Sequence, residues 1–162
     1  MISDQILTLS AQLGELLVGR GWQITCAESC TGGGIGYAIT SAPGSSNWFQ
    51  RGFIIYSNQA KSDLVAVKSE TLIAHGAVSE QVVQEMAKGA AEMAGAEVSV
   101  AVSGVAGPGG GSAEKPVGLV WFGIVVGDRK MNFQKVLPGD RAQIREQTVV
   151  TALTVLIELL NE

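Results

Sequence analysis

The segment AESCTGG, residues 27–33, holds the side chains of this 162-residue chain that are best suited to chemistry. It follows an apolar, strand-like run with Trp22, Ile24 and Cys26, and a helical pattern comes after it. A strand that ends in Ser, Thr and paired Gly before a helix leaves free backbone N–H groups directed at a ligand. Such a turn can hold an anion, or present a serine oxygen beside an oxyanion site. The structural alternative is an ordinary helix cap and tight turn.

Ser29 is the leading candidate for a nucleophile, and it needs a base. His75 is the only histidine and lies at the expected end of a helix, so the chain is poorly supplied for a Ser-His-Asp triad. A desolvated lysine can serve instead, because burial lowers its pKa. Lys61 is the natural choice in the run YSNQAK, five residues after Tyr56 at the end of a strand. The structural alternative is a surface lysine and a packed tyrosine.

A glycine-rich segment, SGVAGPGGGSAEKPVG, spans residues 103–118. A strand that runs into so many glycines exposes N–H groups that can form an anion-binding nest. The segment has neither the Gly-Lys-Ser/Thr of a Walker loop nor a dinucleotide-binding GxGxxG that opens a helix. A flexible connection is the alternative, although loops of this length in compact domains are usually functional.

Arg141 and Arg145 follow the turn PGDR, residues 138–141, at the start of the last predicted helix. Side chains at positions i and i+4 share one helix face, so the pair can clamp a phosphate or a carboxylate. Equally, both could form solvated salt bridges, for instance to Glu146 or Glu28.

Composition excludes several classes of function. The net charge is −4 and the basic residues are scattered, which argues against binding to nucleic acid. Cys26 and Cys30 are separated by three residues, which is not a zinc pattern, and with one histidine we expect no metal and no cofactor. We expect free buried thiols in a reducing cytoplasm. The N-terminus has no signal-peptide pattern and no apolar run reaches membrane-spanning length, so we expect no membrane association.

Periodicity predicts one α/β domain over residues 1–162, with three α/β/α layers and a mixed, mostly parallel sheet. Helices alternate with strands early in the chain, whereas two strands come together late. The expected strands are 23–28, 53–56, 98–102, 119–126 and 131–137. The expected helices are 3–19, 33–40, 62–67, 69–75, a long helix capped by Ser79, and a last helix capped by Asp140.

Five motifs occur together in one order: AESCTGG (27–33), YSNQAK (56–61), GAVS (76–79), SGVAGPGGGSAEKPVG (103–118) and PGDR (138–141). In this they resemble the nicotinamide-nucleotide amidases, whose domain also forms the C-terminal half of the competence/damage-inducible protein CinA. The resemblance covers nearly the whole chain. It implies the stand-alone bacterial form, which hydrolyses nicotinamide mononucleotide to nicotinic acid mononucleotide and ammonia.

The resemblance also implies roles for single residues. Ser29, Tyr56 and Lys61 fall on the positions associated with catalysis, and Ser103 stands where relatives often carry Thr. The residues that we expect to bind substrate are Thr31, Gly32, Gly33, Asn58, Ser103, Gly107, Gly109, Gly110, Arg141 and Arg145.

We hypothesise that Ser29 attacks the carboxamide after Lys61, directly or through Tyr56, takes its proton. N–H groups near Thr31–Gly33 would hold the oxyanion. Alternatively, Tyr56 and Lys61 activate water while Ser29 orients the amide. Two other functions stay open: a non-catalytic nucleotide-binding or partner module, and an amidase for another phosphorylated amide. We also expect a homodimer, with apolar segments such as 48–49 available to an interface.

Overall fold

A computed structural model of the chain describes residues 2–162, in which three consecutive helices separate the second strand from the third. Their bounds are α1 (Asp4–Arg20), β1 (Ile24–Glu28), α2 (Gly34–Thr40), the 3₁₀ turn η1 (Ser45–Asn47), β2 (Phe53–Ile54), α3 (Asn58–Val65), α4 (Ser69–His75), α5 (Glu80–Ala94), β3 (Val98–Gly104), β4 (Leu119–Val126), β5 (Arg129–Val136) and α6 (Arg141–Leu160).

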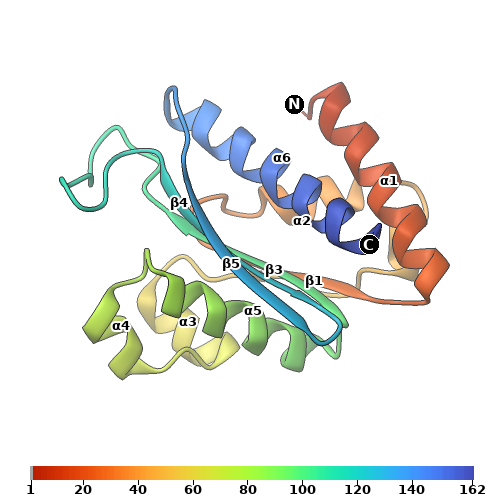
Figure 1. Cartoon of the computed structure of the whole chain (residues 1–162), viewed down its shortest axis with the longest axis horizontal. Coiled ribbons are helices and arrows are strands. Elements are labelled where there is room, and N and C mark those ends of the chain that lie inside the picture. Colours follow the sequence, from red (N-terminus) through yellow and green to blue (C-terminus); the bar gives the residue numbers. More distant parts are fainter. Residues whose placement is uncertain (1) are drawn as a thin grey trace.

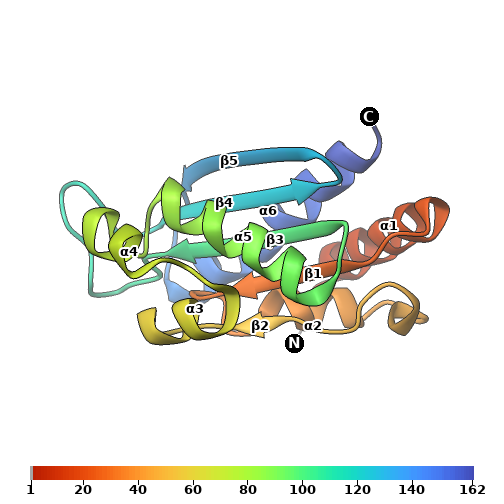
Figure 2. The same ribbon diagram turned by 90° about the horizontal axis from the view of Figure 1, so that it is seen from below.

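The strands form one mixed sheet in the order β2-β1-β3-β4-β5. β1 pairs in parallel with β2 and β3, whereas β3–β4 and β4–β5 are antiparallel. Helices α1, α2 and α6 cover one face of the sheet, and α3, α4 and α5 cover the other (Figures 1 and 2). The predicted three-layer α/β architecture with a mixed sheet is therefore confirmed, but the sheet is not mostly parallel as expected, because the two long pairs β3–β4 and β4–β5 are antiparallel.

Side-chain caps explain where the long helices begin. The Ser3 hydroxyl accepts from the Ile6 N–H at 3.2 Å at the start of α1, and Ser79 does the same for Val82 at the start of α5. Asp140 and Gln143 form a reciprocal capping box at the start of α6. Because each cap satisfies an N–H group that the helix cannot, Ser79 and Asp140 could be identified from sequence.

Two cores flank the sheet, and β1 is buried along its whole length between them. On one side α1, α2 and α6 pack Leu17, Ile35 and Leu153 against the sheet. On the other side α3 and α5 bury Val65 and Met86. A central strand covered on both faces is a rigid support for the residues that follow it.

The segment that carries Lys61 differs from the prediction. β2 ends at Ile54, and α3 already begins at Asn58, where the Ser57 hydroxyl accepts from the Ala60 N–H at 3.0 Å. The expected helix at 62–67 therefore starts too late and ends too late, since α3 stops at Val65. Ser57 was the missed signal, and Lys61 consequently lies within a helix.

Gly89 of α5 determines how closely α3 approaches. A Cβ atom at this position would lie 1.8 Å from the carbonyl oxygen of Val65, the last residue of α3. No real Cβ tolerates that distance, so only glycine permits this packing. The contact fixes the depth at which α3, and with it Lys61, sits on the sheet.

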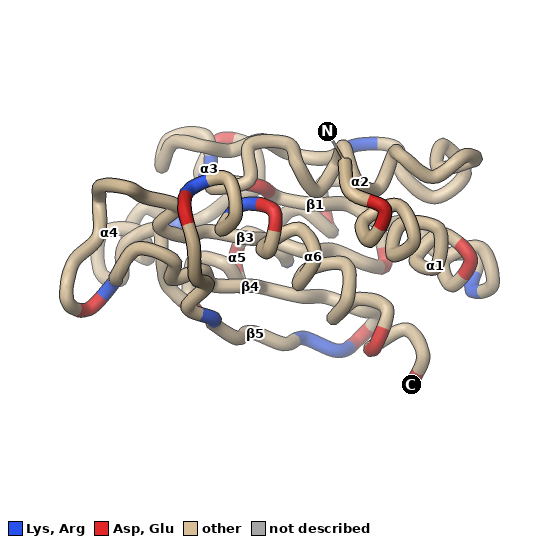
Figure 3. Tube along the Cα trace, turned by 90° about the horizontal axis from the view of Figure 1, so that it is seen from above, with Lys and Arg blue, Asp and Glu red and all other residues tan. Residues whose placement is uncertain are grey.

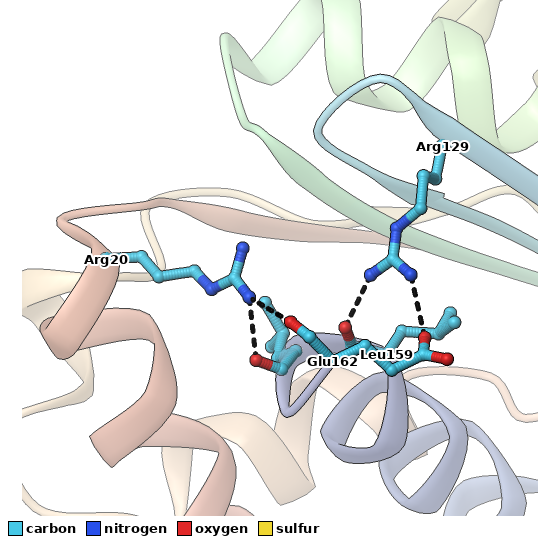
Figure 4. A network of polar contacts seen from close by, with 5 residues as sticks. Arg20, Arg129, Leu159 and Glu162 are labelled. Carbon is cyan, nitrogen blue, oxygen red and sulfur yellow. Dashed lines mark hydrogen bonds and ion pairs between the residues drawn. The ribbon is translucent and has the colours of Figure 1, made fainter.

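Two arginines hold the C-terminal end of α6 (Figure 4). The Arg20 guanidinium donates to the carbonyl of Leu160 at 2.8 Å, and that of Arg129 donates to the carbonyl of Leu159 and contacts the Glu162 carboxylate at 2.7 Å. These cations satisfy carbonyls that the helix leaves free and complement its dipole. They tie α6 to the end of α1 and to the β4–β5 turn.

Lys and Arg positions are spread over several elements and lie among Asp and Glu positions (Figure 3). Within residues 2–162, no helix is both long enough and apolar enough to cross a membrane.

Candidate active site

Ser29 lies in the turn that joins β1 to α2. Its backbone N–H donates to the Val102 carbonyl at 3.2 Å, which extends the β1–β3 pairing by one residue, and its carbonyl accepts from Gly32 at 3.1 Å. Gly32 and Gly33 have φ values of 56° and 107°, in the left-handed region that favours glycine. The paired glycines therefore let the chain reverse into α2 while Ser29 stays at the end of the sheet.

Lys61 reaches the same point from α3 on the opposite side of the sheet. Its Nζ lies 3.2 Å from Ser29 Oγ, 3.1 Å from the Ile55 carbonyl oxygen and 3.3 Å from that of Tyr56. The side chain is only 1% exposed. Desolvation lowers the pKa of this amine below its ordinary value, and a charge on Cys30 would act in the opposite direction. A lowered pKa makes the neutral amine more accessible than in an exposed lysine, and Nζ already contacts the serine hydroxyl, which together are what a general base requires.

Cys30 follows Ser29 directly, but its thiol is held in the protonated form. The pKa of the Cys30 thiol is raised to about 11, chiefly by burial; the Glu28 carboxylate adds to the increase, whereas a backbone hydrogen bond and the charges of Arg145 and Lys61 act in the opposite direction. Burial likewise raises the pKa of Cys26. Because the thiolate is the reactive form, neither cysteine competes with Ser29 as a nucleophile.

Tyr56 lies near the site, but its phenol does not point at Lys61. The side chain is 61% exposed, and its hydroxyl accepts from Arg141 at 3.3 Å. The same guanidinium donates to the Gly107 carbonyl at 2.8 Å. Arg141 therefore joins the tyrosine to the glycine-rich loop, which extends beyond the end of the sheet in Figure 2.

Arg145 has a different environment from Arg141, although the two share a helix face. Its guanidinium donates to the backbone carbonyls of Cys30 and Thr31 at 3.1 and 3.2 Å. In the part of the chain that the structure describes, neither arginine forms a salt bridge with Glu28 or Glu146. Arg145 binds the backbone of the Ser29 turn from α6, whereas Arg141 contacts Tyr56 and the glycine-rich loop. The two arginines therefore do not face one common anion site, as the clamp interpretation required.

The remaining expected residues lie at several depths. Ser103 is buried on β3, one residue after Val102, and the parallel pairing of Val102 with Glu28 places Ser103 and Ser29 at the same end of the sheet. Asn58 is exposed at the first position of α3, and Gly109 and Gly110 are exposed in the loop. A hollow of about 210 Å³ between α1, α2 and α6 is lined by Thr31 and Arg145, but not by Ser29 or Lys61.

Glu28, the last residue of β1, is the important neighbour that sequence reasoning considered only as a salt-bridge partner. Its buried carboxylate accepts from the Thr31 hydroxyl at 2.5 Å and from the N–H groups of Ile35 and Gly36 at 2.8 and 2.9 Å. A buried acid directly before Ser-Cys-Thr-Gly-Gly was the available signal. The group ties the two ends of the turn together.

Fold and site together define an α/β protein with a serine–lysine pair at the carboxyl ends of its parallel strands. The sequence-family model of the CinA C-terminal domain matches residues 6–160 of this chain. The chain belongs to this family, and the resemblance seen in the sequence is confirmed.

Individual relatives agree with this assignment. The chain is 53% identical to the nicotinamide-nucleotide amidohydrolase PncC of Enterobacter agglomerans over 154 residues, which cover 94% of each protein. It is 48% identical to the PncC protein of Escherichia coli K12 over 157 residues, covering 96% of this chain and 95% of that protein. Among solved structures, the competence/damage inducible protein CihA of Agrobacterium tumefaciens superposes with a TM-score of 0.95 at 42% identity, covering 100% of this chain and 99% of that one.

Proposed function

We propose that this protein is a nicotinamide-nucleotide amidohydrolase that converts nicotinamide mononucleotide and water into nicotinic acid mononucleotide and ammonia. The observation that carries the proposal is the contact between Ser29 Oγ and the buried Lys61 amine at 3.2 Å. The names of relatives about half identical over nearly the whole chain supply the substrate class.

In the proposed mechanism the neutral Lys61 amine accepts the Ser29 proton as Oγ attacks the carboxamide carbon. When Lys61 is protonated, Nζ donates to Oγ; when the amine is neutral, the Ser29 hydroxyl donates to Nζ, and the proton is transferred along this contact. The carbonyl oxygen becomes an oxyanion, which we assign to backbone N–H groups of Thr31 and Gly33, since that of Gly32 already donates to Ser29. The Lys61 ammonium returns its proton to the departing nitrogen, which leaves as ammonia.

Hydrolysis of the acyl-enzyme completes the cycle. Lys61 accepts a proton from water as the water oxygen bonds to the acyl carbon; the ester bond to Ser29 Oγ then breaks, and the Lys61 ammonium returns the proton to Oγ, which regenerates the hydroxyl and the neutral amine. Direct activation of water by Lys61 without an acyl-enzyme remains the alternative route. Rapid quench with mass spectrometry separates the two, because only the first leaves the nicotinoyl nucleotide attached to the turn that contains Ser29.

The nucleotide end of the substrate is assigned to the polar groups around Arg141. Its guanidinium, the Tyr56 hydroxyl and the loop at Gly107 already lie in one connected group, with Gly109 and Gly110 exposed beyond it. A phosphate that displaced one carbonyl contact of Arg141 would gain a charge-assisted bond. Asn58 and Ser103 are proposed to contact the nicotinamide ribose and the amide, respectively.

An ammonia-release assay tests the function. Nicotinamide mononucleotide, nicotinamide riboside and free nicotinamide are compared at equal concentration, and we expect turnover to fall in that order as the phosphate and ribose are removed. No release from the mononucleotide at high enzyme concentration would favour a nucleotide-binding module instead. Equal turnover of all three would point to an amidase for another substrate. A cytoplasmic location and a homodimeric state belong to the same proposal and rest on the sequence.

A further inference from the structure

The Glu28 carboxylate is buried, with 1% of its surface exposed, and every hydrogen bond it accepts comes from an uncharged group. Burying an ionised group without a cation is expensive unless several hydrogen bonds compensate. The hydrogen bonds of Glu28 must therefore compensate for this cost, and the groups that donate them all belong to the strand β1, the turn after it and the start of α2.

We propose that Glu28 is a positioning residue for the reaction: its carboxylate sets the conformation of the turn that presents Ser29 to Lys61. This inference rests on the proposed role of Ser29 as the nucleophile.

The bonds of the carboxylate span the whole turn. Oε1 accepts from the Thr31 hydroxyl in the middle of the turn and from the Ile35 N–H in the first turn of α2. Oε2 accepts from the Gly36 N–H at 2.9 Å and faces the Cys26 thiol at 3.6 Å. The residue before Ser29 is thus joined to the residues that follow the two glycines, and the loop between them is closed.

The backbone of Glu28 also reaches the lysine side of the pair. Its carbonyl accepts from the Ile55 N–H at 2.8 Å, and the Ile55 carbonyl accepts from Lys61 Nζ at 3.1 Å. Glu28 therefore fixes the turn of Ser29 through its side chain and the acceptor of Lys61 through its main chain. Small displacements here change the distance between the two reacting atoms.

The chemistry of the contacts requires a carboxylate. Four donors face its two oxygens, and an ionised carboxylate only accepts, whereas an amide presents NH₂ on one arm. In a Glu28→Gln variant that arm would face either the pair Thr31 and Ile35 or the pair Gly36 and Cys26. Donor would meet donor, and the turn would have to shift.

The chain offers a matched control in Glu85 of α5. Its carboxylate accepts from the Lys68 N–H at 2.8 Å and from the Thr71 hydroxyl at 2.6 Å, so it closes the start of α4 with the same pair of bond types. These bonds lie in the other helical layer and do not include the Ser29 turn. Glu85→Gln therefore reproduces the loss of a capping carboxylate without touching the site.

The test compares wild type, Glu28→Gln and Glu85→Gln, with kcat and KM for nicotinamide mononucleotide expressed per folded molecule. We expect Glu28→Gln to lower kcat by about 10- to 100-fold with KM changed less than about threefold, because misplacement of reacting groups by about 1 Å costs on that order. Glu85→Gln should lower the melting temperature and keep kcat. A Glu28→Gln enzyme with kcat within about twofold of wild type would overturn the proposal.

Two further measurements keep the outcome clear. If Glu28→Gln does not fold, Thr31→Val removes one of the four donors and should lower kcat, and Thr31→Ser should restore it; equal kcat in both would contradict the inference. If wild type releases no ammonia, the proposed function fails, and crystal structures then decide the role of Glu28. The distance from Ser29 Oγ to Lys61 Nζ should exceed hydrogen-bonding range in Glu28→Gln, and an unchanged distance overturns the proposal.

Discussion

Ser29, in the turn between β1 and α2, and Lys61, in α3, are 32 positions apart, and the two helices cover opposite faces of the sheet, yet their Oγ and Nζ atoms lie 3.2 Å apart. The distance follows from two neighbouring parallel strands, β1 and β2, whose carboxyl ends meet at one edge. Crevices at that edge are where open α/β sheets bind ligands.

Removing either member of the pair should abolish most of the turnover. We expect Ser29→Ala and Lys61→Met each to lower kcat by about 10³-fold or more, since a nucleophile and its base act as a unit. Ammonia release measures the effect, and Lys88→Met, an exposed lysine on α5, is the control that should keep wild-type activity. Near-normal turnover of Ser29→Ala would remove Ser29 from the nucleophile role.

The pH dependence of kcat/KM should reflect the desolvation of Lys61. Burial lowers the pKa of this amine from its ordinary 10.5, so the neutral, basic form appears at a lower pH than in an exposed lysine. We expect kcat/KM to rise with pH to a midpoint below 10.5. Lys61→Arg, which stays charged, should lose this rise, and a midpoint at the ordinary lysine value would contradict the assignment.

Stability should follow the same shift with a defined sign. The unfolded chain binds the Lys61 proton more tightly than the folded protein does, so the free energy of unfolding should increase as pH rises between the lowered pKa and 10.5. Urea unfolding over that range, compared in wild type and Lys61→Met, isolates the contribution, because the variant should lack this part of the increase.

Both cysteines should resist alkylation in the folded protein. With a thiol pKa of about 11, the thiolate fraction of Cys30 near neutral pH is on the order of 10⁻⁴, and both side chains are buried. Mass spectrometry after iodoacetamide treatment should show no added group, whereas the same treatment in guanidinium chloride should add two. Rapid labelling of the folded protein at Cys30 would contradict the assigned environment.

Gly89→Ala should destabilise the fold and lower activity together. The added Cβ would lie 1.8 Å from the Val65 carbonyl oxygen, so α3 must move, and overpacking of this kind costs about 1–3 kcal/mol. Gly19→Ala in α1 is the matched control, because nothing lies within 4 Å of the added Cβ. Alanine at this helical position should raise the free energy of unfolding by about 0.5–1 kcal/mol. Thermal unfolding and ammonia release, measured on both variants, show whether the displacement of α3 reaches Lys61.

The sequence indicated the architecture because its signals are local. Ser79 and Asp140 lie where a helix needs an acceptor, and the apolar runs that became β3 and β4 are continuous because those strands are largely buried. The predicted helix began too late because the cap of α3, Ser57, opens a polar segment that has no apolar periodicity. A two-residue strand such as β2 leaves almost no periodic pattern to read.

The environment of the site was harder to predict because tertiary contacts create it. Arg145 meets the Cys30 and Thr31 carbonyls across more than a hundred residues, which spacing along a helix does not reveal. Tyr56 was expected beside the lysine ammonium, but only its carbonyl oxygen lies there, while its phenol faces Arg141. The roles of Ser29, Tyr56 and Lys61 in catalysis stay predictions.

The nucleophile follows the central strand β1 in the turn that leads into α2, whereas its base comes from α3, in the helical layer on the other face of the sheet. Activity consequently requires that both helical layers be folded onto the sheet. A partially unfolded species in which α2 or α3 has left the sheet lacks one member of the reacting pair in its place. Such species should be inactive. Destabilising conditions should therefore lower turnover of the substrate without producing activity on other substrates.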